Sequence, residues 1–234
     1  MINVSAQARR CSFHSARRVF FFCGLALAAS GSSAAELRGF VSEGAAGVLQ
    51  YQPCISGAIS QQLFPIDDKT PNGSLRAGVG AVRQIMLHRY RPLYVEMRGD
   101  RGKTNITAHQ FQRALSAVDS CKTLPKDIAP KVQLLANGGP PSWQLVVTDA
   151  TAILELPDKI SLKLPVAAFK TVGTTQTTKD TLARNYDAQS AEGTPVRIEV
   201  NPQMCSDGRS ETAYGARVTV RIEKRTFAGC AARF

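Results

Sequence analysis

Short β-type runs recur along the chain, several of them with apolar and polar residues in alternation, a pattern typical of half-buried β-strands. In the first half of the chain the runs cover residues 37–41, 47–51 and 93–97. In the second half they cover residues 131–135, 143–148, 152–156, 160–164, 167–172, 196–200 and 216–223. Turn-forming residues separate the runs, so the pattern predicts a mainly β fold of two small antiparallel barrels or sandwiches.

One stretch replaces this alternation with a spacing of three to four residues, which indicates a helix. Its apolar side chains would share one face: Leu75, Val79, Val82, Ile85, Met86 and Tyr90. Ser74 is a suitable cap for the first turn, and Pro92 prevents the helix from continuing far beyond Tyr90. We therefore expect a packing helix from Ser74 or Leu75 to about Tyr90.

Residues 107–118 fit two structures equally well. Thr107 and Gln110 have the spacing of a capping box, which would open a second helix. The same stretch can form a strand that leads toward Cys121, and the sequence leaves both alternatives open.

The first 35 residues have the organisation of a cleavable signal peptide. Four arginines between residues 9 and 18 precede an apolar run of 11 residues, 19–29, and small residues follow at 30–35. The most suitable cleavage site lies between Ala35 and Glu36. Since a membrane-spanning helix needs about 20 apolar residues, we expect no transmembrane segment after cleavage and a periplasmic location.

Four cysteines remain in the exported chain: Cys54, Cys121, Cys205 and Cys230. Four cysteines allow three pairings. A Pro-containing segment, residues 124–130, separates the first two from the last two, so sequential pairing keeps each bridge within one domain. We therefore predict the bridges Cys54–Cys121 and Cys205–Cys230, and the domains 36–123 and 131–234 with a linker at 124–130.

Basic residues are concentrated in one part of the first predicted domain. Loss of the leader leaves 25 basic and 18 acidic residues, a net charge of +7. A candidate anion-binding patch comprises Arg83, Arg89, Arg91, Arg98, Arg101 and Lys103. Such a patch could bind an anionic envelope surface or an envelope protein, whereas export argues against nucleic acid. A solvated face that aids solubility accounts for the same residues.

Few residues offer material for catalysis or metal binding. The exported chain has two histidines, His88 and His109, and no motif for zinc or for a nucleophile with its base. Residues 99–104 resemble a phosphate-binding loop, but Met97 stands where that loop requires its first glycine. We therefore expect a non-enzymatic protein with no catalytic residue, no metal and no cofactor.

A second hypothesis concerns the loop after Cys205. Residues 207–214 form a short polar loop beside the predicted bridge, and its candidate functional residues are Asp207, Arg209 and Tyr214. Envelope proteins that inhibit lysozyme insert a comparable loop into a cleft that carries carboxylates, and Arg209 could pair with such a group. The alternative function is thus an inhibitor or another active protein that works through this loop.

Several motifs together resemble a family of bacterial envelope proteins, many of them lipoproteins. The motifs are Gly39-Phe40, Gln52-Pro53-Cys54, the stretch 92–99, the stretch 137–143, and C-x-D, Tyr214 and G-C-A near the C terminus. This resemblance covers most of residues 37–231. It implies two β-rich domains, the first similar to the barrel of NlpE-type lipoproteins, and a role in envelope homeostasis or stress without an established activity. The chain lacks the C-x-x-C pair of NlpE-like proteins.

Overall fold

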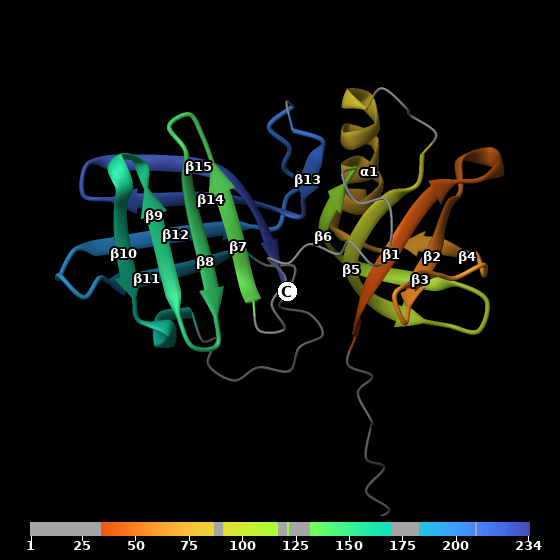
Figure 1. Cartoon of the computed structure of the whole chain (residues 1–234), viewed down its shortest axis with the longest axis horizontal. Helices are drawn as coiled ribbons and strands as arrows, with labels where there is room; N and C mark the ends of the chain where they lie inside the picture. The colour runs from red at the N-terminus through yellow and green to blue at the C-terminus, as the bar shows by residue number, and fades with distance from the viewer. Residues whose placement is uncertain (1–33, 87–90, 117–120, 122–131, 170–182, 209) are drawn as a thin grey trace, which may run out of the picture. The chain divides into compact units, whose positions relative to one another are not determined.

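Two β-sheets and one α-helix form the part of the chain that the computed structural model describes, residues 34–86, 91–116, 121, 132–169, 183–208 and 210–234 (Figure 1). The first sheet contains β1 (Ala35–Glu43), β2 (Leu49–Ile55), β3 (Ala58–Ile59), β4 (Phe64–Asp68), β5 (Leu93–Arg101), β6 (Ile106–Leu115) and β13 (Thr212–Tyr214). The second contains β7 (Val132–Gly138), β8 (Trp143–Thr148), β9 (Ala152–Leu156), β10 (Ile160–Leu164), β11 (Arg184–Gln189), β12 (Pro195–Asn201), β14 (Ala216–Ile222) and β15 (Arg225–Arg233). The predicted mainly β fold is confirmed.

Five strands of the first sheet close into a barrel. β1 pairs with both β2 and β5, and the pairs β5–β6, β6–β4 and β4–β2 complete the ring. All of these pairs are antiparallel except β4–β6. The ring order β1-β2-β4-β6-β5, with the helix between β4 and β5 in the chain, is that of five-stranded OB-type barrels. β3 extends the edge of β2, and β13 pairs with β6.

The helix α1 (Ser74–Ile85) follows a 3₁₀ turn, η2 (Pro71–Gly73). Ser74 is its first residue and not its cap, because Gly73 occupies the cap position with φ at 61°. Residues upstream satisfy the free amides instead: Leu75 N–H donates to Thr70 Oγ1 at 3.1 Å and Arg76 N–H to Asp68 Oδ2 at 3.0 Å. The predicted end near Tyr90 is also wrong, since Met86 is already extended.

α1 packs directly on the first barrel. Leu75, Val79 and Val82 are buried in one apolar cluster with the inward side chains of the strands. A Cβ on Gly78 would lie 2.5 Å from the ring of Phe111 on β6, so glycine permits the close approach of helix and strand. The ambiguous stretch 107–118 is therefore a strand where it is described, and α1 lies against it.

The second sheet has eight antiparallel strands in the order β10-β9-β8-β7-β15-β14-β12-β11 and encloses a single apolar cluster, as in a nearly closed barrel. Just after the edge strand β11, the amide of Ala191 donates to the carbonyl of Lys163 on the other edge strand, β10, at 3.2 Å. The predicted strand at 167–172 is wrong where it is described. Residues Val166–Phe169 form a 3₁₀ turn, in which Ala168 N–H bonds to the carbonyl of Pro165.

Both predicted disulfides are confirmed: Cys54–Cys121 and Cys205–Cys230, with Cα atoms 5.5 and 5.4 Å apart. They indicate an oxidising, extracytoplasmic compartment. In the described residues, no helix has the length and apolar character needed to cross a membrane. Residues 1–33 of the predicted signal peptide and the linker 124–130 lie outside the described residues, and Ala35, just before the predicted cleavage site, is the first residue of β1. Cleavage and the division into two domains therefore stay predictions.

Candidate functional site

A row of side chains crosses the outer wall of the second barrel. Glu155 pairs with Gln144, Gln144 with Asn137, Asn137 with Cys230, and Cys230 with Arg217. Directly paired residues of neighbouring strands point to the same face of a sheet. The flanking positions on these strands belong to the apolar core, so the row lies on the opposite face of the wall.

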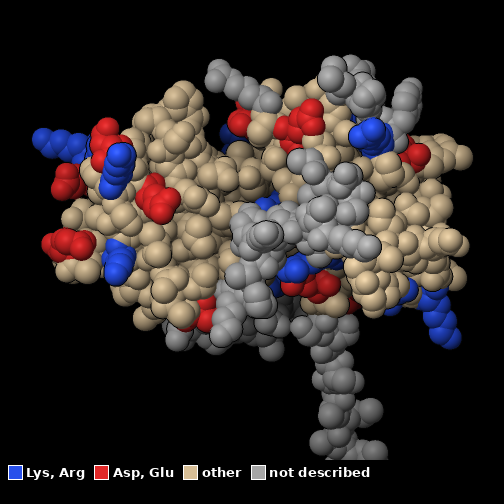
Figure 2. Space-filling model, in the orientation of Figure 1, with Lys and Arg blue, Asp and Glu red and all other residues tan. Residues whose placement is uncertain are grey.

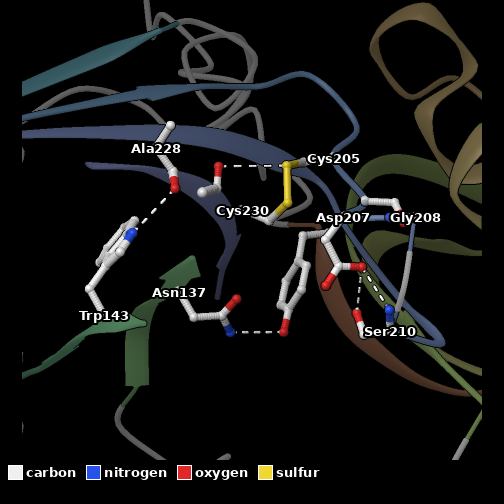
Figure 3. The surroundings of a disulfide bond; sticks show 11 residues. Asn137, Trp143, Cys205, Asp207, Gly208, Ser210, Ala228 and Cys230 are labelled. Atoms are coloured by element: carbon white, nitrogen blue, oxygen red, sulfur yellow. Dashed lines mark hydrogen bonds between the residues drawn. A yellow bond between two sulfur atoms is a disulfide. The ribbon is translucent and has the colours of Figure 1, made fainter. Parts of the chain in front are cut away.

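The loop from Cys205 to Tyr214 is closed at its ends and attached to this row at two points. Its ends are paired through two backbone hydrogen bonds, Cys205 N–H to Tyr214 O at 2.9 Å and Tyr214 N–H to Cys205 O at 2.8 Å. The disulfide joins Cys205 to Cys230, and Asn137 Nδ2 donates to the hydroxyl of Tyr214 at 3.0 Å (Figure 3). The bridge therefore attaches the loop to the wall and fixes Tyr214 above it.

Internal hydrogen bonds shape the tip of the loop. Asp207 Oδ1 accepts from the amide of Ser210 at 2.8 Å and from its hydroxyl at 2.9 Å (Figure 3). Ser206 Oγ accepts from the amide of Gly208 at 3.2 Å, and Gly208 has φ at 68°, a conformation that glycine adopts readily. Asp207 thus organises the loop as an Asx turn, while its side chain remains exposed.

The β7–β8 turn forms another border of the site. It packs so closely on β15 that glycine is required on both sides of the contact. The turn contains two cis peptide bonds, Gly139–Pro140 and Pro140–Pro141. A Cβ on Gly138 would lie 2.3 Å from the carbonyl oxygen of Ala228, and one on Gly229 would lie 2.1 Å from that of Asn137. The motifs at 137–143 and 229–231 are therefore in direct contact.

These parts enclose an open cleft of about 1170 Å³, which we call the disulfide cleft. Its polar lining side chains come from the row, the loop and neighbouring positions: Asn137, Ser142, Gln144, Glu155, Ser206, Asp207, Ser210, Tyr214, Arg217 and Thr219. Trp143 lies beneath it, only 4% exposed, and donates from Nε1 to the carbonyl of Ala228 at 3.2 Å. The indole is therefore part of the core and offers no stacking surface.

Charges of both signs meet in the disulfide cleft. Glu155 and Arg217 are exposed, and neither forms an ion pair within the described part of the chain. Amide and hydroxyl groups surround them. Such a lining can bind a carboxylate through Arg217, a cationic group through Glu155, and amides or hydroxyls in between.

The structure places two of the three predicted loop residues, Asp207 and Tyr214, in the disulfide cleft. Arg209 lies outside the described residues. Sequence reasoning missed Gln144, Glu155 and Arg217 as site residues. The missing information was the register between strands, which alone shows that these side chains form one row.

The residues of the predicted basic patch lie in two places along the first barrel. Arg83 on α1 pairs with Glu43 at 2.6 Å, and Arg91 precedes the start of β5. Arg98, Arg101 and Lys103 lie at or beyond its other end, about 20 Å or more away at the rise of an extended strand. Arg89 lies outside the described residues, and Figure 2 shows basic and acidic side chains interspersed on the face in view. The anion-binding patch stays a prediction.

A buried charged cluster on β5 and β6 was not predicted. Glu96, with no exposed surface, accepts from Arg113 Nε at 2.6 Å and from the Tyr94 hydroxyl at 2.8 Å. Burial, and secondly the Glu96 carboxylate, raise the pKa of Tyr94 far above its usual range. Phe234 covers the cluster with its ring 5.6 Å from the Arg113 guanidinium carbon. Because the cluster is enclosed, we interpret it as structural.

His109 on β6 contacts an acidic side chain of β5. His109 Nε2 lies 2.8 Å from Asp100 Oδ2, and among the described residues no group of three or more His, Cys, Asp or Glu side chains is arranged to hold an ion. His88 lies outside the described residues.

Comparison of the chain with models of protein families, with curated proteins and with solved structures finds no match, so the assignment of a function depends on the geometry of the disulfide cleft.

Proposed function

We propose that this protein is a non-catalytic binding protein of the bacterial periplasm that holds an anionic envelope component in the disulfide cleft. The observation that carries the proposal is the row Glu155–Gln144–Asn137–Cys230–Arg217 facing a loop attached by a disulfide. A preorganised loop lowers the conformational cost of binding, since its groups are already in place. The leader and the disulfides support an exported location.

The chemistry of the lining favours a ligand that carries both amides and a carboxylate. Arg217 can form a two-pronged hydrogen bond with a carboxylate, and the side-chain amides of Gln144 and Asn137 can pair with ligand amides. Fragments of the cell-wall glycan with attached peptides combine these groups. The exposed carboxylates of Glu155 and Asp207 are not desolvated as an acid–base pair would be, which supports binding over catalysis.

Calorimetry with soluble cell-wall glycopeptides tests this function, with a neutral, amide-free oligosaccharide for comparison. We expect the glycopeptide to bind and the neutral oligosaccharide not to bind. Arg217→Gln should weaken glycopeptide binding about 10-fold or more, because a charge-assisted hydrogen bond is lost. Arg221→Gln is the matched control, since Arg221 lies on the same strand and face but pairs with Glu199. Equal affinity of Arg217→Gln and wild type would overturn the proposal.

Action through the tip of the loop on a protein partner, as in a lysozyme inhibitor, remains the alternative prediction. The internal bonds of Asp207 to Ser210 fix the tip but do not identify a partner. Inhibition assays with Asp207→Ala would separate this function from ligand capture in the cleft.

A further inference from the structure

We propose that a second surface, at one end of the first barrel, attaches the protein to a bilayer with anionic headgroups. This surface, which we call the aliphatic tip, comprises Ile55, Ile59, Leu63, Arg101 and Lys103. None of these residues lines the disulfide cleft, so the inference is independent of the function proposed for that site.

Three aliphatic side chains of the aliphatic tip face solvent. Ile55 is 49% exposed, Ile59 40% and Leu63 46%. They come from one stretch of nine residues in which β2 turns into the edge strand β3 and then leads into β4. Isolated exposed aliphatic residues are ordinary, but here Ile59 pairs with Cys54 and so lies on the opposite face from Ile55. The projecting hairpin is therefore apolar on both faces, and Leu63 follows it in the chain.

The turn between β2 and β3 gives this projection a defined shape. Ser56 and Gly57 both have positive φ, 50° and 78°, as in the tight two-residue turns of β-hairpins. Ser60 N–H bonds to the carbonyl of Pro53 at 2.9 Å, and Gln52 Nε2 donates to the carbonyl of Ser60 at 3.2 Å. The aliphatic side chains are therefore presented by an ordered hairpin.

Two cations lie beside the aliphatic residues. The guanidinium carbon of Arg101 is 4.7 Å from the centre of the Phe64 ring, directly after Leu63 in the chain. Lys103 belongs to the β5–β6 turn, which Gly102 N–H closes by bonding to the carbonyl of Asn105. β4 and β6 run parallel with Ile66 opposite Ile106, and Ile106 pairs with Arg101, so the start of β4 lies at the end of the barrel that carries the β5–β6 turn.

The acidic residues near Arg101 and Lys103 pair with other side chains, so both cations can contact an anionic surface. Within the described residues, Arg101 and Lys103 form no ion pair, whereas the neighbouring acids have partners. Asp100 contacts His109 at 2.8 Å, Asp67 contacts Lys69 at 3.3 Å, and Glu36 contacts Arg38 at 2.7 Å.

Aliphatic residues flanked by unpaired cations match the physics of peripheral membrane binding. The aliphatic side chains enter the headgroup boundary, and the cations are attracted by the negative surface potential. Each contribution alone is weak, so attachment should require both and be reversible. A bilayer with negative headgroups satisfies both parts of the surface at once.

Vesicle flotation of the exported protein tests the attachment, with vesicles that contain or lack phosphatidylglycerol and with increasing salt. We expect binding only to the anionic vesicles, weakening as the salt concentration rises. The double variant Arg101→Gln/Lys103→Gln should lower the partition coefficient about 30-fold, because each cation near the surface contributes roughly five-fold. Ile59→Ser/Leu63→Ser should reduce it as well, with the salt dependence kept.

Matched controls exist on the second barrel. Lys224→Gln/Arg225→Gln removes the same charge from an exposed turn, where Arg225 likewise lies over an aromatic ring, that of Phe227. Ile160→Ser removes an exposed aliphatic side chain elsewhere. All variants share one N terminus, so any contribution of that segment to binding is common to them, and thermal melts exclude unfolding.

Three outcomes would overturn the attachment to a bilayer. The first is no flotation with anionic vesicles at low salt, and the second is an equal loss with the Lys224/Arg225 control. The third is a change of oligomeric state in Ile59→Ser/Leu63→Ser, measured by sedimentation, without any vesicle binding, because the aliphatic tip would then contact a second copy of the chain. Since the cleft assay uses other residues, failure here leaves the glycopeptide test intact.

Discussion

β5 in the first barrel and β14 in the second have similar alternating sequences but bury different numbers of faces. β14 buries Val218, Val220 and Ile222 and exposes Arg217 and Arg221, as alternation predicts. On β5 every residue from Leu93 to Met97 is buried. The difference arises on the outer face of each strand. Residues distant in sequence, Cys121 among them, cover the outer face of β5, whereas the outer face of β14 remains accessible to solvent.

The largest expected difference between the barrels concerns their ion pairs. Glu96→Gln leaves Arg113 charged and buried, so the free energy of unfolding should fall by about 3–5 kcal/mol. Glu199→Gln breaks the solvent-exposed pair with Arg221 and should change it by less than about 1 kcal/mol. Urea unfolding measures both.

Removal of both charges provides the control for this effect. Glu96→Leu/Arg113→Met should recover much of the lost stability, because the buried anion and the buried cation are removed together. If Glu96→Gln and Glu199→Gln lower the free energy of unfolding by similar amounts, the Glu96–Arg113 pair is solvated. The expected difference between the two barrels would then be absent.

Removal of the disulfides should have nearly equal effects on stability but different effects on binding. The Cys54–Cys121 bridge spans 67 residues and the Cys205–Cys230 bridge 25. In the chain-entropy model their replacement by alanine pairs costs about 4 and about 3.5 kcal/mol, respectively. Only the second pair should also abolish glycopeptide binding, which calorimetry on the still-folded fraction would show; full binding without that bridge would contradict the role of the attached loop.

A smaller effect on stability is expected for the first barrel at alkaline pH, because Tyr51 lies on β2 and Tyr94 on β5. Burial raises the pKa values of Tyr51 and Tyr94 far above their ordinary value of 10.0, so the folded state keeps protons that the unfolded state releases. Stability is therefore fully present below pH 10 and falls above it, by up to about 1.4 kcal/mol per pH unit for each tyrosine. Urea unfolding at rising pH measures the fall, and Tyr94→Phe should reduce its slope. An unchanged slope would contradict this assignment.

Local sequence was sufficient for three neighbouring strands of the second barrel. The bounds of β8, β9 and β10 agree with the alternating runs, because one face of each strand meets the core and turns separate them. β4 was missed, since proline and two aspartates interrupt its apolar residues, and β11 was missed because it is mostly polar. Pairing with neighbours overrides the weak local preference of both.

The candidate site was only partly predictable for a similar reason. Cysteine spacing and turn residues located the loop around Asp207 and Tyr214. Nothing local shows that Glu155 and Arg217 share one face with Asn137, because this depends on four successive strand registers. The two disulfides were predictable because sequential pairing keeps each bridge on one side of the Pro-containing segment 124–130.

The position of β13 limits where the gene can be divided into separately expressed parts. Thr212–Tyr214, late in the chain, hydrogen-bonds to β6 of the first barrel, and Gly215 then lies so close that a Cβ would meet the carbonyl of Phe111. A gene cut between the codons for residues 116 and 132 would therefore encode a first fragment that is not self-sufficient. It would lack a strand that only the second fragment can donate, and co-expression should restore what separate expression loses.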